Sequence, residues 1–421
     1  MLPFLKTKTH RQQFGKYLRW HRIKQHLSLR QAADAIGLSH TFINQIEHGK
    51  ATITDDTYDR LLQIIPKIDF PADTLTKTFE DLVESTERIA LHLEFGRVRE
   101  VIQDFNATKP FFLYHYLIVD YSLYKMLVFN LDPRLEKTFF EDEFSLLQAI
   151  IPLMNDLEKR LYYLAYGAYL LFSGDYPKSH EILKKALSYP HLVKWNSIIH
   201  FLLGICLSEL NAASSAIKEL EHAYQLSIQN NLFIPSVVSR IWIQLVNFRV
   251  HYDLEALNFD DAYLFAQKYD LHDFKNIIAF NQLIYFIRLK QYQKGLSVLD
   301  ILPVSLRTDY YKALCYLHLD EQIKALEITK QALTKNADET MVLYHKGLYC
   351  IQTHILKDSL KDHKYEAALK DFFMQSKEEY AMEENHWVYT LYLNYLKQNK
   401  RYKDAYHITQ SMIHHVITKG S

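Results

Sequence analysis

The chain has 421 residues with only 10 glycines and 10 prolines, and its 49 Lys and Arg balance 49 Asp and Glu. This length exceeds a single compact core, and so few turn-forming residues predict an all-α protein built from several domains or repeats. Three cysteines lie far apart, which gives no support to a disulfide framework or a zinc knuckle. We expect Cys206, Cys315 and Cys350 to be buried apolar residues in a reducing compartment.

The sequence does not indicate secretion or membrane insertion. The N-terminus lacks the apolar core of a signal peptide. The most apolar run, Phe111–Leu131, contains His115, Asp120 and Lys125, and such side chains predict two buried helices rather than a membrane span. We therefore expect a cytoplasmic protein without membrane contact.

The charges are unevenly distributed along the chain. Residues 1–33 hold eight Lys or Arg and no Asp or Glu, so the remaining residues carry an acidic excess of eight. A basic head on an acidic body favours a polyanionic partner for the head alone.

We call residues 1–70 the head, and three helices are predicted in it between residues 14 and 49. The first runs from about residue 14 to residue 26, with apolar side chains at helical spacing. Ser28 and Gln31 then form a capping box, which predicts the start of a short second helix over residues 29–36. Gly37 follows where a helix ends in a left-handed residue.

The third predicted helix is amphipathic and follows the cap residue Ser39. Ile43 and Ile46 face inward, and Gly49 ends the helix. Amide and hydroxyl side chains occupy the other side, where a recognition helix reads base edges in the major groove. The predicted DNA contacts on this side are Ser39, His40, Thr41, Asn44 and Gln45.

Residues 14–65 resemble the Cro/repressor-type helix-turn-helix family of bacterial and phage regulators. The segments that carry the resemblance are Leu18–Arg22, Leu27–Ser39 and Ile43–Gly49. The resemblance implies a five-helix domain over residues 1–70 that binds double-stranded DNA. The alternative is a packing unit with no DNA role, but such a unit has no reason to avoid carboxylates over 33 residues.

The same resemblance assigns roles to single positions. It implies an ion pair between Arg22 and Glu47, which we expect to be half-exposed and to contribute about 1 kcal/mol. Many members carry a Gln directed at a phosphate where this chain has Leu29. Arg30 or Lys50 is therefore expected to make that backbone contact instead.

An internal repeat follows the head, whose end is marked by Pro66 and Pro71. From residue 73 onward helical periodicity is nearly continuous, and small residues recur at steps of 12, 4 and 3. The three clearest sets are Gly167, Ser179, Leu183 and Ala186; Gly204, Ala216, Leu220 and Ala223; and Ala313, Ala325, Thr329 and Ala332. Leu283 with Gly295 and Leu393 with Ala405 keep only the 12-residue step.

Two antiparallel helices approach closely only where small residues face each other, and the 12-residue step carries this contact across a turn. The pattern resembles tetratricopeptide repeats, with the best copy at Arg160–Pro190. It implies an α-solenoid over residues 71–421, with five or six helix pairs from about residue 155 and less regular helices between 75 and 150. The alternative is a generic helical bundle with alanines at helical spacing.

A solenoid of this kind has a concave groove lined by its first helices. Asn247 and Asn281 fall mid-way along two successive first helices, where an Asn amide is suited to gripping a peptide main chain. The alternative is that both Asn residues cap or bridge neighbouring helices. Further predicted peptide contacts are Arg240, Gln244 and Arg288, with Tyr285 and Tyr310 as an aromatic wall.

Catalytic and metal-binding motifs are not found in the sequence. It contains no phosphate-binding loop, dinucleotide fingerprint, nucleophile elbow or HExxH motif, so we predict no enzyme and no cofactor. His414 and His415 point about 100° apart on a helix and do not chelate one ion easily, so no metal site is predicted. His21, His40 and His48 are interpreted as neighbours of phosphates or bases.

A helix-turn-helix head before a tetratricopeptide-like body resembles the peptide-pheromone-responsive regulators of Gram-positive bacteria, the Rgg, NprR, PlcR and PrgX relatives of the Rap proteins. The resemblance implies a homodimer whose repeats bind a short signalling peptide and thereby change promoter occupancy in quorum sensing. Two alternatives remain open. One is a repeat-based interaction module that sequesters another regulator, and the other is a phage or plasmid repressor without a peptide ligand.

Overall fold

The structure is a computed structural model that describes residues 7–67, 72–131, 137–190, 195–251, 259–334, 341–357, 363–378 and 386–420. These residues form helices and no strand, which confirms the all-α prediction for this part of the chain. None of the described helices is both long and apolar enough to span a membrane. The chain divides into two compact units, Met1–Asp253 and Leu254–Ser421, and each is described by itself.

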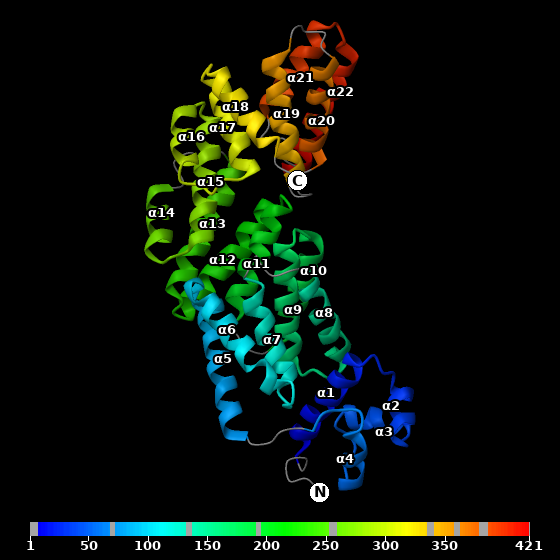
Figure 1. Ribbon diagram of the computed structural model, residues 1–421. Helices are drawn as coiled ribbons and strands as arrows, with labels where there is room; N and C mark the ends of the chain where they lie inside the picture. Colours follow the sequence, from blue (N-terminus) through cyan, green and yellow to red (C-terminus); the bar gives the residue numbers. More distant parts are fainter. Residues whose placement is uncertain are drawn as a thin grey trace. The chain divides into compact units, whose positions relative to one another are not determined.

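The first unit begins with α1, three short helices follow it, and longer helices continue the chain (Figure 1). Its α-helices are α1 (Lys8–Lys24), α2 (Leu29–Ile36), α3 (His40–Glu47), α4 (Asp55–Leu61), α5 (Ala72–His92), α6 (Val98–Phe112), α7 (Ile118–Phe129), α8 (Lys137–Ile150), α9 (Asp156–Phe172), α10 (Tyr176–Leu187), α11 (Asn196–Glu209), α12 (Ala213–Gln229) and α13 (Phe233–His251). Two single 3-10 turns, η2 (Phe95–Arg97) and η3 (Ile151–Leu153), lie between them.

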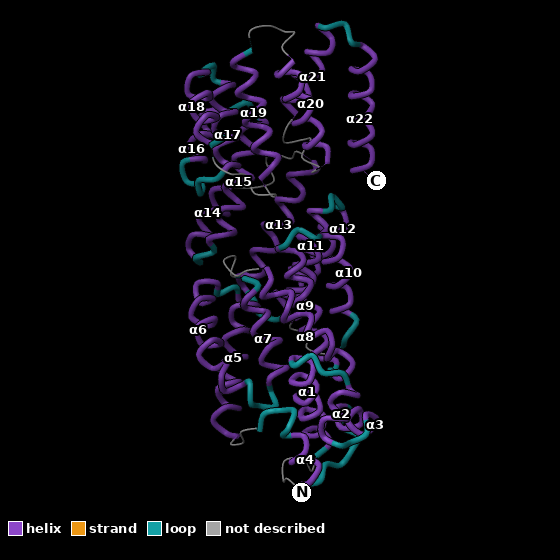
Figure 2. Tube along the Cα trace, turned by 45° about the vertical axis from the view of Figure 1, so that its right-hand side comes forward, coloured by secondary structure: helices purple, strands orange, loops and turns teal. Residues whose placement is uncertain are grey.

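The described residues of the second unit consist mainly of helices (Figure 2). They are α14 (Phe259–Lys268), α15 (His272–Arg288), α16 (Tyr292–Leu299), α17 (Leu306–His318), α18 (Gln322–Ala332), α19 (Val342–Leu356), α20 (His363–Glu378), α21 (His386–Gln398) and α22 (Tyr402–Gly420).

The N-terminal helices largely follow the predicted caps. Ser28 and Gln31 form the capping box of α2, and the backbone φ of Gly37 is 65°. The first helix starts earlier than predicted, at Lys8, because the Thr7 side chain accepts a hydrogen bond from the His10 amide. The five-helix count was one too high for the described residues, since the chain after α4 makes turns rather than a fifth helix before residue 68.

The small-residue pattern of the repeats is confirmed as helix packing. A Cβ atom added to Gly167 would lie 2.6 Å from the Leu183 side chain, and one added to Gly204 would lie 2.5 Å from Leu220. The hydroxyl of Ser179, 12 residues after Gly167, donates a 2.8 Å hydrogen bond to the Gly167 carbonyl. The step of 12 therefore joins α9 to α10 and α11 to α12 at their closest approach.

Consecutive helices pack as pairs through most of the described repeats. The pairs are α9 with α10 and α11 with α12 in the first unit, and α15 with α16, α17 with α18, α19 with α20 and α21 with α22 in the second. This agrees with the expected five or six pairs. The turn inside a pair repeatedly ends in a left-handed residue, as at Gly174, Asn211, Lys290, Asp320 and Lys400. Since only one of these five is Gly, the chain makes these turns with few glycines.

The apolar run at Phe111–Leu131 forms the end of α6 and all of α7, and α7 is almost entirely buried. Cys206, Cys315 and Cys350 are free thiols and buried, as predicted. The first compact unit joins the N-terminal helices to the repeats, because α1 packs against α7, α8 and η3. The boundary between units thus falls after Asp253, within the predicted 71–421 domain.

Candidate functional site

The helices α2 and α3 form a helix-turn-helix around Gly37. The Ser39 side chain accepts a hydrogen bond from the Phe42 amide, which starts α3 directly after the turn. Ile43 and Ile46 are buried below α3, as predicted. This arrangement fixes which side of α3 remains available for a ligand.

The predicted DNA contacts all lie on the surface. Every side chain in this set is exposed: Arg30, Ser39, His40, Thr41, Asn44, Gln45 and Lys50. Four of them, at positions 40, 41, 44 and 45, have the spacing of one side of a helix. The structure therefore brings the predicted readers together on α3, with Lys50 just after its C-terminal turn. Arg30 lies on α2, apart from them.

Two glycines allow α1 to cross α3 closely. A Cβ atom on Gly15 would overlap the backbone carbonyl of Glu47, so the two helix backbones are in direct contact there. Gly49 has φ of 63°, and a Cβ atom there would lie 2.8 Å from the backbone nitrogen of Gln12. The glycine that ends α3 thus also seats the helix against α1.

Arg22 and Glu47 form the ion pair that the resemblance implied. Arg22 Nε donates to Glu47 Oε1 at 2.6 Å, and a second guanidinium nitrogen donates to Oε2 at 3.2 Å. Arg22 also donates to the Leu27 carbonyl at 2.6 Å, which ties the turn before α2 to α1. The expectation of a half-exposed pair was wrong, because both side chains are buried.

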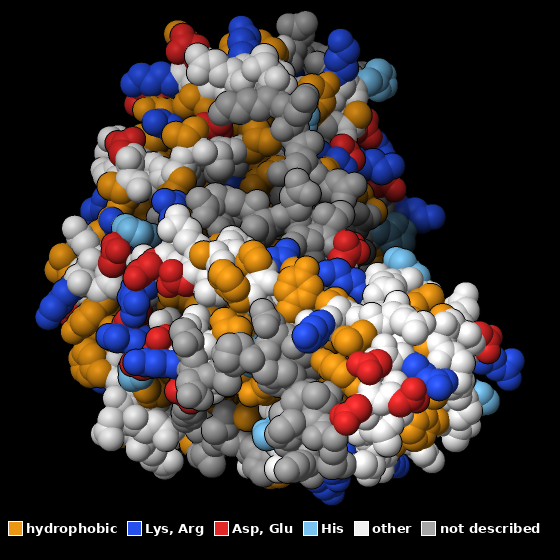
Figure 3. Space-filling view, turned by 60° about the horizontal axis from the view of Figure 1, so that its bottom comes forward, with side chains coloured by type: hydrophobic (Ala, Val, Ile, Leu, Met, Phe, Trp, Pro, Cys, Tyr) orange, Lys and Arg blue, Asp and Glu red, His pale blue; other side chains and the backbone are white. Residues whose placement is uncertain are grey.

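The basic head is less basic at its surface than its composition suggests. Lys16 and Arg22 are buried in ion pairs, and Arg19 lies 3.8 Å from Glu47. Asp34, Asp55, Asp56 and Asp59 are exposed. Acidic and basic side chains are accordingly interspersed in the view from the end that carries α1–α4 (Figure 3).

Lys16 joins the head to the repeats. Its ammonium pairs with Glu158 of α9, whose second oxygen accepts from the Asn155 amide in the capping box of that helix. Burial lowers the pKa of Lys16, but the carboxylates of Asp120 and Glu158 outweigh it and raise the pKa. Burial also raises the pKa of Asp120, against the effect of the Lys16 ammonium. Sequence reasoning missed this contact, because it joins positions 142 residues apart.

His21 forms a second contact between head and repeats. Its Nε2 lies 2.9 Å from the Leu113 carbonyl, and the ring packs on Tyr17 with centroids 4.5 Å apart. Burial lowers the pKa of His21 to about 4, partly opposed by the Leu113 hydrogen bond. The interpretation of His21 as a phosphate or base neighbour was wrong, because the ring is buried against α6–α7.

Three predicted peptide contacts lie on α13 of the first unit. Arg240 is exposed, while Gln244 and Asn247 are partly buried. Their spacing of three and four residues places them along one side of the helix. The structure therefore leaves all three side chains at least partly accessible.

The other predicted peptide contacts lie on α15 and α17 of the second unit. Asn281 is 6% exposed, and its Nδ2 donates to the Ile277 carbonyl of its own helix at 2.8 Å. Tyr285 and Arg288, further along α15, are partly buried. Asn247 and Asn281 belong to different units, so they are described separately.

Tyr310 was wrongly predicted as part of an aromatic wall. It is 0% exposed and packs against Tyr311 and Phe372, with ring centroids 4.9 and 5.8 Å away. Its hydroxyl accepts a 2.7 Å hydrogen bond from the indole of Trp387. Tyr310 is a core residue that joins α17 to α20 and α21.

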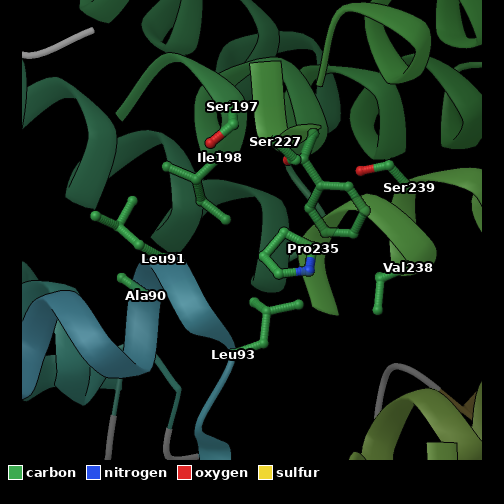
Figure 4. A pocket seen from close by; sticks show the side chains of 10 residues that line it. Ala90, Leu91, Leu93, Ser197, Ile198, Ser227, Pro235, Val238 and Ser239 are labelled. Atoms are coloured by element: carbon green, nitrogen blue, oxygen red, sulfur yellow. The ribbon is translucent and has the colours of Figure 1, made fainter. Parts of the chain in front are cut away.

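A small apolar pocket lies between the end of α5 and the helices α11, α12 and α13 (Figure 4). Leu91, Leu93 and other apolar side chains line it, together with one serine from each of the three helices. These serines are Ser197, Ser227 and Ser239, and all are buried. None of the predicted peptide contacts lines the pocket, although Arg240 directly follows Ser239.

The two adjacent histidines at His414 and His415 lie outside the residues whose side chains the structure describes. A different set, His200, Glu219 and His222, comes together on α11 and α12. Sequence reasoning missed it, although Glu219 and His222 have the three-residue spacing that puts two ligands on one side of a helix.

Comparison with known proteins bears first on the head. Residues 18–69 match the family model HTH_3, described as Helix-turn-helix. The N-terminal segment is a helix-turn-helix domain. A search of curated proteins found no match.

Solved structures are similar to the chain over most of its length. A Rap protein in complex with Competence and Sporulation Factor superposes with a TM-score of 0.65 at 12% identity, over 82% of this chain and 99% of the other. The apo form of the quorum sensor NprR from B. thuringiensis superposes with a TM-score of 0.56 at 14% identity. The match covers 82% of this chain and 100% of the NprR chain. NprR in complex with its cognate peptide NprX superposes with a TM-score of 0.54 at 15% identity, over 78% of this chain and 100% of the other. The resemblance expected from the sequence is confirmed for the fold, a helix-turn-helix domain followed by tetratricopeptide-like repeats.

Proposed function

We propose that this chain is a sequence-specific transcriptional regulator that reads DNA through α3 and is controlled by a short signalling peptide. Residues 1–70 bind an operator, and residues 71–421 bind the peptide and form a homodimer in the cytoplasm. The observation that carries the proposal is the exposed polar side of α3 in a chain that shares its fold with NprR, a quorum sensor solved with its cognate peptide. No catalytic role and no cofactor form part of the proposal.

On the DNA side, the proposal gives different tasks to two residues. Gln45 reads a base edge, since its amide is suited to bidentate pairing with adenine. Lys50 contacts a phosphate, because it is exposed just beyond α3. Two heads of a dimer reach successive major grooves when they are about 34 Å apart.

On the peptide side, the proposed main-chain contacts are Asn247 on α13 and Asn281 on α15. Each has its proposed neighbours on the same helix, Arg240 and Gln244 on α13 and Tyr285 and Arg288 on α15. Asn247 is the more accessible of the two, so it is the first position to vary. For the peptide to act as a switch, it must bind the DNA-competent and DNA-incompetent arrangements with different affinity.

The test is fluorescence anisotropy of the full chain on DNA flanking its own gene, across salt concentrations, with and without short peptides encoded nearby. We expect the affinity for DNA to fall steeply with increasing salt and to change when one of the peptides is added. The change in affinity should be absent in Asn247→Ala. A salt-dependent affinity for DNA that none of the peptides changes would support a repressor without a peptide ligand. Absence of DNA binding would overturn the proposal and favour a module that sequesters another regulator.

Two head variants distinguish base reading from phosphate contact. Gln45→Ala should lose about 1–3 kcal/mol of preference for the operator over a mismatched site. Lys50→Ala should weaken binding to all sequences and lower the salt slope by about 1. Lys184→Ala, an exposed lysine on α10, is the matched control and should change neither. Equal losses on specific and random DNA in both head variants would contradict the assignment.

A further inference from the structure

Two imidazoles and a carboxylate meet between two helices of one repeat. His200 lies on α11, and Glu219 and His222 lie on α12. One nitrogen or oxygen atom from each residue lies within 4.8 Å of those of the other two. His200 Nδ1 is 2.6 Å from Glu219 Oε2, and the rings of the two histidines have centroids 5.3 Å apart.

The backbone around these residues is held by tight packing. At Gly204, one turn after His200, α11 packs against Leu220 and Ala216 of α12 so closely that a Cβ atom would lie 2.5 Å from the Leu220 side chain. Leu220 is adjacent to Glu219, so the close contact fixes the distance between the helices beside the cluster. Glu219 and His222 are three residues apart and project from one side of α12. The relative placement of the three side chains thus follows from the helix crossing.

The cluster is open to solvent. The side chains of His200 and Glu219 are 18% and 23% exposed, and His222 is exposed. An ion can therefore enter from solution without unfolding the repeat. The partial burial of the first two side chains removes some competing water from the site.

We propose that His200, Glu219 and His222 form a binding site for a divalent transition metal ion, with Zn²⁺ as its preferred occupant. Nitrogen ligands suit zinc, whereas magnesium and calcium prefer oxygen ligands. Zn–N and Zn–O bonds of about 2.0–2.2 Å put two ligands of one tetrahedral ion about 3.4 Å apart. His200 Nδ1 and Glu219 Oε2 are 2.6 Å apart and the ligand atoms of all three residues lie within 4.8 Å of one another, so only small side-chain rotations are needed to reach that spacing.

Zinc binding would have two consequences in the protein. Zinc binds the deprotonated forms of its imidazole and carboxylate ligands, so its binding weakens at acid pH. It also links α11 to α12, because the ligands come from both helices. Three protein ligands leave the fourth position of the ion to water. The inference does not depend on the proposed regulatory function.

The test measures zinc binding to the full chain after removal of metal with a chelator. Equilibrium dialysis against ZnCl₂ should show one more tightly bound Zn²⁺ per chain in the wild type than in His200→Asn/His222→Asn. We expect each single variant, including Glu219→Gln, to bind this ion about tenfold or more weakly. Titration with Co²⁺ should give the visible absorption bands of a tetrahedral ion in the wild type and not in the double variant.

The chain has 21 histidines, so a matched control is needed to show that the loss of zinc binding is specific to this cluster. His92→Asn replaces an exposed histidine of the same unit, at the end of α5, and should bind zinc like the wild type. Circular dichroism of each variant reports whether its helices are intact. Equal zinc stoichiometry and affinity in the wild type and the double variant would overturn the proposal. So would an octahedral Co²⁺ spectrum.

Discussion

At the scale of single residues, the head is held together by Arg22 and Glu47. Arg22 uses its guanidinium to bind the Glu47 carboxylate and the Leu27 carbonyl at once. Glu47 ends α3, so this pair connects α3 to α1 and to the turn before α2. A buried pair of this kind gives geometric specificity, and its loss leaves an uncompensated charge in the core.

Arg22→Met should therefore destabilise the head by about 3–5 kcal/mol, because Glu47 would stay buried without its partner. Hydrogen exchange of the α1 and α3 amides, read by mass spectrometry, measures the local free energy of opening. Lys24→Met, an exposed change on the same helix, is the control and should alter exchange little. A similar effect of both substitutions would show that the ion pair is not required.

At the scale of helices, the closest approach within a repeat depends on a residue without a side chain. Gly204 lies on the first helix of its pair, α11, and Gly295 on the second helix of another pair, α16, and their surroundings differ. A Cβ atom on Gly204 would lie 2.5 Å from Leu220, whereas one on Gly295 would lie 3.4 Å from Cys315 and Leu283.

Gly204→Ala should consequently cost about 1–3 kcal/mol, since the helices must separate to admit the methyl group. Gly295→Ala should be neutral or slightly stabilising, because its methyl group meets ordinary contacts and alanine favours the helix. Urea unfolding of both variants beside the wild type measures the difference. If Gly295→Ala proves the more harmful, the Cβ distances do not control packing here.

The contact between α1 and the repeats should depend on pH through His21. Burial lowers the pKa of His21 from its ordinary value of 6.5 to about 4 in the folded protein. The unfolded chain then binds a proton first as pH falls, so this stabilisation is present above about 6.5 and lost toward 4. The loss amounts to up to about 3 kcal/mol.

His21→Gln removes the titrating group and keeps a donor for the Leu113 carbonyl. The free energy of unfolding of the variant should fall less steeply than that of the wild type between pH 6.5 and pH 4. Urea unfolding at four pH values in this interval measures both slopes. Parallel slopes would mean that His21 is not held neutral by its burial.

At the scale of the whole molecule, the head is fastened to the repeats by the same helix that supports α3. One side of α1 packs on α3 through Gly15, and another carries Lys16 to Glu158 of α9. The proposed peptide control therefore has a structural route from the first repeats to α3, through α1.

The double variant Lys16→Met/Glu158→Gln tests this connection by removing both charges of the Lys16–Glu158 pair at once. Gln keeps the capping box of α9, so the helix should stay folded. We expect normal salt-dependent DNA binding but a reduced peptide response in anisotropy. Lys185→Met/Glu181→Gln, an exposed pair on α10 with the same charge change, should respond to peptide like the wild type. An unchanged response in both would rule out this route.

The local structure of the head and the packing rule of the repeats could be predicted from the sequence alone. Ser28, Gln31 and Gly37 act within a few residues of themselves, so their roles as caps depend only on local geometry. The step from Gly204 to Leu220 likewise repeats at a fixed period because each helix pair packs on itself. The exposed readers on α3 follow from the same helical periodicity.

Burial and long-range contact were decided only by the tertiary structure. Tyr310 was placed on a groove wall from its position in a helix, yet neighbouring helices enclose it completely. Lys16 was counted as surface charge, although Glu158, far along the chain, takes it into the core. The cluster of His200 with Glu219 and His222 also depends on how two helices cross. Sequence spacing determines which side of a helix a residue occupies, but the packing of other helices determines what that side meets.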